Sequence, residues 1–324
     1  DKVGHNVYLL DNMRHGHKEN LQIRGESFGT FIEADIRDED FVKHTEGVDY
    51  VVHLAGLSSL PLCQSNPKYA MDVNVSGTAN VLEACRLSGV KRVVFASTGA
   101  IYENNIEVPF YEGITVDPLL IYPTSKYQAE RLCDCYQVCY GMDIVTLRFF
   151  NVYGPHQDFN RKQPPFTGYL LKQFLSGGEI SVFSDGEQAR DYVHIDDLTK
   201  LIETCLTHKS AEGQIFNACS GQAYSVNEIV NTMMGLFGIN IDIAAISDED
   251  GNLDISYRDP KTYWDNYPIL YKGSYPMNRD VVEHEVDKYA LGDASKAEEF
   301  LGWKAKISLE EGLQTLVDYA KEIS

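Results

Sequence analysis

Short apolar segments rich in β-branched residues alternate with longer amphipathic segments in the first half of the chain. The short segments, which are typical of strands, are Val7–Leu10, Thr30–Glu33, Tyr50–Leu54, Val93–Ala96 and Ile144–Phe149. Between them, Asn66–Ser88 and Thr124–Tyr140 repeat apolar residues with the period of an α-helix. This alternation predicts a parallel, doubly wound sheet, in which the continuous apolar strand Tyr50–Leu54 is covered on both faces.

The alternation ends after Phe149. Prolines and paired glycines mark loops around a shorter predicted helix, Gly168–Leu175. The stretch Ser247–Asp287 is rich in Asp, Tyr, Pro and Gly and has no clear period. It is longer than an ordinary connection, so we expect it to be functional or mobile. Helical patterns return at Ala294–Leu301 and Leu309–Ile323.

Composition narrows the class of protein. With 324 residues and 36.5 kDa, the chain is long enough for one large α/β domain or two modest ones. Hydrophobic residues make up 44%, which excludes disordered and fibrous classes. The sequence has no run of 18 consecutive apolar residues, so we predict no membrane span. A net charge of −20 disfavours binding to nucleic acid or an anionic membrane and is typical of a solvated surface.

The seven cysteines are an odd number in a long chain, which argues against a disulfide framework. Cys133, Cys135 and Cys139 suggest a metal site, but positions i, i+2 and i+6 do not converge on one face of a helix. We therefore favour free thiols over metal ligands and expect a reducing cytoplasm.

The sharpest short motif is Tyr122-Pro-Thr-Ser-Lys126. If a helix begins at the tyrosine, Tyr122 and Lys126 lie on one face. An ammonium near a phenol lowers the pKa of the phenol from about 10 toward neutrality and makes it a usable base. Thr98 ends an apolar strand, where the ligands of such sheets bind; its alternative is a turn residue or a helix cap. The spacing alone is weak evidence, since the chain contains 20 tyrosines.

Together these residues resemble the extended short-chain dehydrogenase/reductase superfamily, and specifically its nucleotide-sugar epimerase/dehydratase branch. Further matching blocks extend the resemblance over nearly the whole chain: Val7–Asn12, Asp35–Asp38, Leu54–Gly56, Asn74–Ala84, Arg148–Pro155, Arg190–Asp197, Leu291–Ala297 and Leu301–Trp303. One block could match by chance, but several blocks in the same order could not.

The resemblance implies an α/β fold with a doubly wound, Rossmann-type sheet and a smaller C-terminal substrate-binding lobe. Residues 1–151 would form the NAD-binding domain. Residues 152–324 would form mainly the nucleotide-sugar-binding lobe, with about 190–220 returning to the first domain. Such a fold begins with a strand and a glycine-rich turn that this sequence lacks, so we expect roughly 15–25 further N-terminal residues in the natural protein.

The cofactor implied by the resemblance is NAD. Asp11 would bind the two ribose hydroxyls, and a carboxylate there favours NAD over NADP. Each of two further residues has an alternative to cofactor binding: Asn74 could be a buried helix amide, and Asp35 could be an acid in a turn. The full set of implied cofactor residues is Asp11, Asn12, Asp35, Ile36, Leu54, Ala55, Gly56, Asn74, Tyr122, Lys126 and Phe149.

The implied substrate is a nucleotide sugar, bound by Thr98, Asn151, Arg190, Arg279 and Ala290. Arg190 matches the family's pyrophosphate-binding arginine, whose guanidinium fork suits diphosphate oxygens; its alternative is a surface ion pair. Arg279 lies several residues too early for the family's second phosphate ligand, so its role stays open.

The resemblance also implies a mechanism and a set of catalytic residues: Tyr122, Lys126 and Thr98. Tyr122, as phenolate, would remove the sugar hydroxyl proton while C4 gives hydride to the nicotinamide. Lys126 would stabilise the phenolate and hold the nicotinamide ribose, and Thr98 would bind the same sugar oxygen. The 4-keto sugar would then turn and take the hydride back on its other face.

The residues after Thr98 decide between branches of the family. The 4,6-dehydratases have Asp-Glu there and the decarboxylases a glutamate at the second position, whereas this chain has Gly99 and Ala100. We therefore expect a 4-epimerase of a UDP-hexose or UDP-N-acetylhexosamine. The alternatives are a dehydratase, a decarboxylase, a reductase or a non-catalytic nucleotide-sugar-binding scaffold.

Sugar size depends on Ala290, which by resemblance lies against the sugar, where a small residue leaves room for an N-acetyl group. A slip of one residue in the alignment would put Tyr289 there instead. Glu103 stands where the family usually has glycine, and we expect it to reshape the loop over the sugar.

The family pairs two helices across a two-fold axis, so we expect a homodimer. The helices are Asn66–Ser88 and Thr124–Tyr140, with Val81, Ala84, Cys85, Cys133 and Tyr136 as candidate contacts. The alternative is that these residues face the sheet.

The irregular stretch carries four aromatic residues, Tyr263, Trp264, Tyr267 and Tyr271. They would either rebuild the nucleotide pocket or form a small core of their own.

Overall fold

The computed structural model describes residues 4–23, 26–161, 163–239, 255–262, 264–265, 267–278 and 280–323. Its centre is a parallel sheet in the order β11-β7-β6-β5. The strands are β5 (Tyr50–His53), β6 (Arg92–Thr98), β7 (Ile144–Phe149) and β11 (Ile215–Ala218). All seven residues of β6 are buried, which makes this strand the core of the sheet.

A second parallel pair precedes the central sheet in the chain. Strand β1 (Tyr8–Asp11) pairs with β4 (Thr30–Glu33), so that Asp11 lies opposite Glu33 at the strand ends. A short antiparallel pair, β2 (Gln22–Ile23) and β3 (Glu26–Ser27), lies between them in the sequence.

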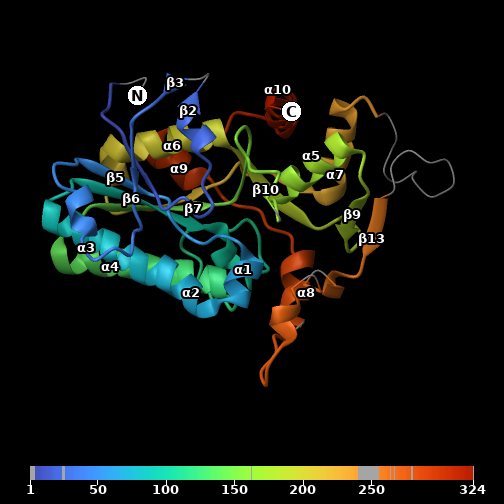
Figure 1. Ribbon diagram of the computed structural model, residues 1–324, viewed down its shortest axis with the longest axis horizontal. Helices are drawn as coiled ribbons and strands as arrows, with labels where there is room; N and C mark the ends of the chain where they lie inside the picture. The colour runs from blue at the N-terminus through green and yellow to red at the C-terminus, as the bar shows by residue number, and fades with distance from the viewer. Residues whose placement is uncertain are drawn as a thin grey trace.

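Helices cover both faces of the central sheet (Figure 1). On one face, α3 (Thr78–Ser88) and α4 (Ile121–Tyr140) pack against Val93, Phe95 and Ile144. On the other, α6 (Ile195–Thr207) and α9 (Ser295–Leu301) pack against Val94, Val145 and Leu147. Alternate residues of β6 and β7 therefore enter two different cores, as a doubly wound sheet requires.

The region predicted as one helix, Asn66–Ser88, is continuous but not uniform. It follows the short helix α1 (Leu60–Ser65), runs through α2 (Pro67–Met71), becomes π-helical over Asp72–Gly77 and continues as α3. The π-helical segment contains Asn74, and such segments often occur at functional sites.

A second lobe follows β7 in the chain. It contains the strand sets β12-β10-β8 and β13-β9, which are covered by α5, α7 and α10 around one apolar core. Its elements are β8 (Asn151–Tyr153), α5 (Phe166–Ser176), β9 (Ile180–Phe183), β10 (Ala189–His194), β12 (Ala223–Ser225), α7 (Val226–Leu236), β13 (Ile255–Arg258), α8 (Asp280–Asp287) and α10 (Leu309–Ile323). Between β10 and β12 the chain returns to the central sheet as α6 and β11. The exact division into domains stays a prediction.

Three expectations need correction. Among the described residues, strand β5 is the edge strand of its sheet, so Val52 is 36% exposed and the strand is not covered on both faces. The stretch 247–287 is partly regular, since β13 and α8 lie within it. Of the candidate dimer contacts, Val81, Ala84, Cys85 and Cys133 are at most 3% exposed because they pack against the sheet.

Three of the four aromatic residues singled out in the stretch 247–287 belong to a small core. Trp264 and Leu270 are buried there, with Tyr267 and Tyr271 packed against them; Tyr263 lies outside the described residues. No described helix is both long enough and apolar enough to span a membrane.

Candidate active site

A cavity of about 600 Å³ lies at the carboxyl ends of β6 and β7, between the central sheet and the second lobe. Ligands of open parallel sheets bind at this edge. Nine of the residues expected from the sequence line the cavity: Leu54, Gly56, Thr98, Tyr122, Lys126, Phe149, Asn151, Arg190 and Ala290. The three expected catalytic residues are therefore brought together.

Thr98 is held in place by the turn that follows it. Its Oγ1 accepts a hydrogen bond from the N–H of Ala100 at 3.1 Å and caps the short helical turn Gly99–Tyr102. The side chain thus serves as a cap and also lines the cavity. Gly99 packs closely on Phe150, because a Cβ at position 99 would lie 3.1 Å from that ring.

Tyr122 and Lys126 lie in the first two turns of α4 and line the same cavity. Burial raises the pKa of Tyr122 to about 12, although a hydrogen bond from Thr98 opposes the rise. Burial also lowers the pKa of Lys126 to about 8, so its ammonium is still largely charged at neutral pH. The Nζ atom lies 4.4 Å from the centre of the Phe95 ring.

The expectation that the pKa of Tyr122 falls toward neutrality is wrong for this structure, because burial raises it. The reason is that desolvation of the phenolate outweighs the favourable contacts, and the ammonium of Lys126 lies over Phe95.

Asn74 is fully buried and bonded to protein at both ends of its amide. Its Oδ1 accepts from the N–H of Leu57 at 2.7 Å, and its Nδ2 donates to the carbonyl of Leu57 and to Ser125 Oγ at 2.8 Å. Ser125 in turn donates to the carbonyl of Tyr122 at 2.7 Å. Asn74 therefore ties the turn after β5 to the helix of Tyr122, and a direct cofactor contact stays a prediction.

The acidic residues expected to bind the cofactor lie at the ends of β1 and β4. Asp11 is exposed and accepts from the N–H of Met13 at 2.7 Å. Asn12 donates to Asp35 at 2.8 Å, and Arg37 donates to both carboxylate oxygens of Asp35. These contacts hold the pKa of Asp35 well below its usual range. Ile36 packs on the π-helical segment, since a Cβ at Gly77 would lie 2.5 Å from its Cδ1.

The turn after β5 tests whether the site fits a dinucleotide. Leu54 and Ala55 are exposed there, and a Cβ at Gly56 would lie 3.2 Å from Asn74 Oδ1 and 3.8 Å from Lys126 Nζ. Glycine therefore lets the backbone run close over Lys126 and leaves the cavity open. With Asp11 exposed at the end of β1, these residues fit NAD.

Arg190 does not present a free guanidinium to the cavity. It donates to the backbone carbonyls of Glu285, Val286 and Lys288, at the C-terminal end of α8. Carbonyls at a helix C-terminus lack partners within the helix, so a cation is stabilised there. The alternative expectation for Arg190, a surface ion pair, is also wrong, because its described partners are backbone carbonyls and not carboxylates.

The other expected substrate residues differ in what surrounds them. Asn151 donates to the carbonyl of Asp191 at 3.1 Å. Ala290 is 6% exposed and lines the cavity, whereas Tyr289 lies outside the lining and is 51% exposed. Arg279 lies outside the described residues.

Glu103 lies outside the cavity lining and accepts hydrogen bonds from the N–H groups of Leu119 and Leu120, just before α4. Its expected effect on the loop over the sugar stays a prediction.

Several residues in the lining were not expected from the sequence. They include Ser58, Ser59, Arg161, Tyr267, Glu285 and Lys288. The sequence did indicate Tyr267, because it is one of the four aromatic residues singled out in the stretch Ser247–Asp287. Glu285 and Lys288 pair at 2.9 Å with the i, i+3 spacing of a helix, but no motif points to them.

A buried ion pair lies directly beneath the site. Arg148 on β7 donates to Glu130 on α4 at 2.9 Å, and both side chains are at most 4% exposed. Glu130 also accepts from Ser97, the neighbour of Thr98, and Arg148 donates to Tyr102 at 2.7 Å. This network joins the strand of Thr98 to the helix of Tyr122.

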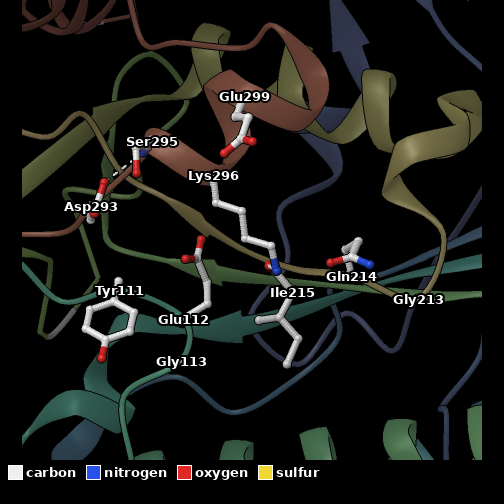
Figure 2. Close-up of a pocket in the computed structure, with 10 residues that line it drawn as sticks. All are labelled: Tyr111, Glu112, Gly113, Gly213, Gln214, Ile215, Asp293, Ser295, Lys296 and Glu299. Atoms are coloured by element: carbon white, nitrogen blue, oxygen red, sulfur yellow. Dashed lines mark hydrogen bonds between the residues drawn. The ribbon is translucent and has the colours of Figure 1, made fainter.

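A second cavity of about 470 Å³ lies between α9 and β11, and none of the expected site residues line it. Figure 2 shows Lys296 extending from α9 toward Ile215 there. Lys296 donates to the carbonyl of Ile215 at 2.8 Å, and Glu112 accepts from the N–H of Asn217 at 2.7 Å. Both charged groups therefore form hydrogen bonds with the backbone of β11, the edge strand of the described sheet. We do not take this cavity as the candidate site, because none of the expected residues line it.

Known proteins resemble this chain over nearly its full length. A UDP-glucuronate 4-epimerase from Thermodesulfobacterium geofontis is 30% identical over 99% of this chain and 90% of its own. A solved UDP-glucose 4-epimerase with UDP-glucose from Thermotoga maritima has a TM-score of 0.83 at 28% identity, covering 99% of this chain and 93% of that one. A UDP-N-acetylglucosamine 4-epimerase from Methanobrevibacter ruminantium, in complex with UDP-N-acetylmuramic acid, has a TM-score of 0.82 at 25% identity, covering 98% and 91%.

The match to a family is equally direct. Residues 1–219 match the NAD dependent epimerase/dehydratase family, which spans the central sheet and the cavity residues Thr98, Tyr122 and Lys126. Together with the 30% identical relative, this match identifies the chain as a member of the NAD dependent epimerase/dehydratase family.

Proposed function

We propose that this protein is an NAD-dependent 4-epimerase of a nucleotide sugar. The observation that carries the proposal is the cavity in which Thr98, Tyr122 and Lys126 meet while Gly99 and Ala100 follow Thr98. Neither residue can exchange protons, so elimination or decarboxylation lacks its extra acid or base. The relatives named above support the same class of reaction.

NAD would be held along the edge from β1 to β6. Asp11 would bind the ribose hydroxyls, Asp35 and Ile36 the adenine end, and Leu54–Gly56 with Phe149 the nicotinamide end. Asn12 and Asn74 would support these segments. When bound, NAD supplies the acceptor and donor of the hydride at C4 of the sugar.

The side chains of this protein would then handle the proton. Tyr122 Oη would take the proton of the 4-hydroxyl, and Thr98 Oγ1 would orient the same oxygen. The ammonium of Lys126 would stabilise the phenolate and hold the nicotinamide ribose. Turning the 4-keto sugar in the cavity before the hydride returns to C4 and the proton to its oxygen would invert C4.

The diphosphate of the substrate would bind Arg190. Its guanidinium would have to exchange the carbonyls at the end of α8 for phosphate oxygens, which form the stronger, charge-assisted hydrogen bonds. Asn151, beside it in the lining, would bind the sugar or phosphate. Arg279, as a second phosphate ligand, stays a prediction.

Ala290 would leave space for an N-acetyl group. Because Ala290 faces the cavity and Tyr289 does not, we infer that UDP-N-acetylglucosamine and UDP-N-acetylgalactosamine interconvert on this protein, with some activity on UDP-glucose. A wider pocket loses only a few contacts with a smaller sugar.

The direct test is incubation with UDP-, GDP- and dTDP-linked sugars, followed by NMR of the anomeric protons. We expect the C4 epimer of at least one UDP-sugar. Ala290→Tyr should abolish the N-acetylated reaction and keep the plain one, with Tyr289→Ala as the matched control. Activity on UDP-galactose or UDP-glucuronate with none on UDP-N-acetylgalactosamine would refute the assignment of Ala290.

We also propose a homodimer in the cytoplasm. The outer surfaces of α3 and α4 carry Leu87, Val138 and Tyr140, each more than half exposed, which suits pairing of these helices. The seven free thiols support a reducing compartment. Light scattering giving the mass of a monomer at micromolar concentration would contradict the dimer, and cell fractionation tests the location.

A further inference from the structure

The helix that carries Tyr122 begins without a capping side chain of its own. Helix α4 starts at Ile121, and its N-cap residue, Leu120, provides no side-chain acceptor. The first N–H groups of a helix have no partner within the helix, and Leu120 is only 2% exposed. Because Tyr122 lies in the first turn, its position depends on acceptors from other parts of the chain.

Two side chains from distant segments supply these acceptors. Glu103 Oε1 accepts from the N–H of Leu119 and from the N–H of Leu120, the latter at 2.8 Å. Gln64 Oε1 accepts from the N–H of Ile121 at 2.6 Å. The start of α4 is therefore capped from outside.

Glu103 is the more informative of the two because of its place in the chain. It directly follows the turn Gly99–Tyr102, which Thr98 caps. One carboxylate thus connects the segment that carries Thr98 to the helix that carries Tyr122. In the proposed function, these two segments carry the two oxygens that meet at the sugar hydroxyl.

The surroundings of Glu103 are those of a fixed group and not of a solvated acid. Its Oε2 is buried and has no hydrogen-bond partner within the described residues. Burial raises the pKa of the carboxyl, while the N–H groups of Leu120 and Leu119 oppose the rise. A carboxylate is kept in such a position only by specific bonds of this kind.

We propose that Glu103 is a positioning residue for Tyr122, which caps α4 from outside and sets the separation of the phenol from Thr98. The inference rests on the proposed function, in which Tyr122 accepts the proton of the sugar 4-hydroxyl. Glu103 lies outside the cavity lining, so it acts through the helix and not on the substrate. A misplacement of the order of 1 Å can cost about 10²-fold in rate.

Two conservative variants separate position from charge. Glu103→Gln keeps the oxygen and its reach but loses the charge, whereas Glu103→Asp keeps the charge but is one methylene shorter. We expect the kcat of Glu103→Gln to stay within about 3-fold of the wild-type value. The kcat of Glu103→Asp should fall about 10-fold or more, and KM should change little in either variant. Glu107→Ala, an exposed acid in the same loop, is the control and should leave both constants unchanged.

If Glu103→Asp stays active and Glu103→Gln is impaired, the proposal is overturned, because the charge of the side chain and not its position would then matter. Equal kcat values in wild type, Gln and Asp would overturn it as well. A change confined to KM would point to substrate binding and would likewise contradict a role through the helix.

Hydrogen exchange of the peptide spanning Leu119–Tyr122 gives a readout that needs no turnover. Protection should fall in Glu103→Asp and persist in Glu103→Gln on the NAD-loaded protein. Unchanged protection in the Asp variant would overturn the capping. If the wild-type chain epimerises no sugar, the proposed function fails, while the exchange experiment still decides whether Glu103 holds α4.

Discussion

The two ends of the proposed cofactor site hold their polar groups in different ways. At the ends of β1 and β4, Asp35 and Arg37 form an ion pair that is a fifth to a third exposed, and Asp11 is open to solvent. At the ends of β6 and β7, Lys126 is 5% exposed and burial shifts its pKa. Exposed groups can bind a ribose with little cost, whereas burial shifts the pKa values of the groups that are proposed to move the proton.

The comparison predicts its largest effect for the buried ion pair Arg148–Glu130, beneath the proposed catalytic residues. Arg148→Met leaves the Glu130 carboxylate buried without its partner and should lower the free energy of unfolding by about 3–5 kcal/mol. The matched change at the exposed end, Arg37→Met, should cost at most about 1 kcal/mol. Denaturant unfolding measures both, and equal losses would remove the distinction between the two ends.

At the level of turnover, Tyr122→Phe should lower kcat by about 10²-fold or more because the proton acceptor is lost. The fold and the amount of bound NAD should not change. Tyr69→Phe is the control at the other end, where the ring contacts Arg14 at 4.4 Å. If Tyr122→Phe keeps most of its turnover, the phenol is not the base.

Removing Lys126 should move the pH dependence of the rate. Burial lowers the pKa of Lys126 to about 8, so its ammonium is positive below that pH, and in the proposed function this charge would favour the phenolate of Tyr122. Without it the phenol loses its proton at higher pH, so in Lys126→Ala the rising limb of the pH–rate profile should shift upward by about one unit. An unchanged limb would separate Lys126 from the base.

The smallest effect is expected at the exposed end. Asp11→Asn should weaken NAD binding by about 10-fold or less and reduce the preference for NAD over NADP, because one charged acceptor for the ribose hydroxyls becomes neutral. Calorimetry of cofactor binding measures both. Glu33→Gln, at the neighbouring strand end, is the control and should leave the affinity unchanged.

Periodicity alone was enough for the elements that build the site. Ile144–Phe149 and Leu309–Ile323 occur with the expected bounds, and the expected helix Thr124–Tyr140 begins only three residues earlier. These segments have strong local patterns, so tertiary contacts did not override them. Helix α8 has a short pattern inside a stretch rich in turn residues, and the local signal was too weak to predict it.

The motifs named residues that the structure brings together, but they did not indicate the contacts of these residues. Thr98, Tyr122 and Lys126 meet because strand ends and helix starts share one edge of the sheet, which topology alone predicts. That Arg190 caps α8 depends on a segment about a hundred residues away in the sequence, and no spacing rule reaches that far. The rise in the Tyr122 pKa depends on burial, which a motif does not contain.

The distribution of the free thiols makes helix α4 open to chemical labelling without mutation. Cys63, Cys85, Cys133, Cys205 and Cys219 are buried, and burial raises the pKa of Cys63 and Cys85 to about 12, so their reactive thiolates are scarce. Cys135 and Cys139 are exposed near the end of α4, on the helix that begins with Tyr122. A fluorophore or spin label added to the native chain would therefore attach to this helix and report on its surroundings directly. If two copies associate through α3 and α4, the labelling rate itself would fall with protein concentration.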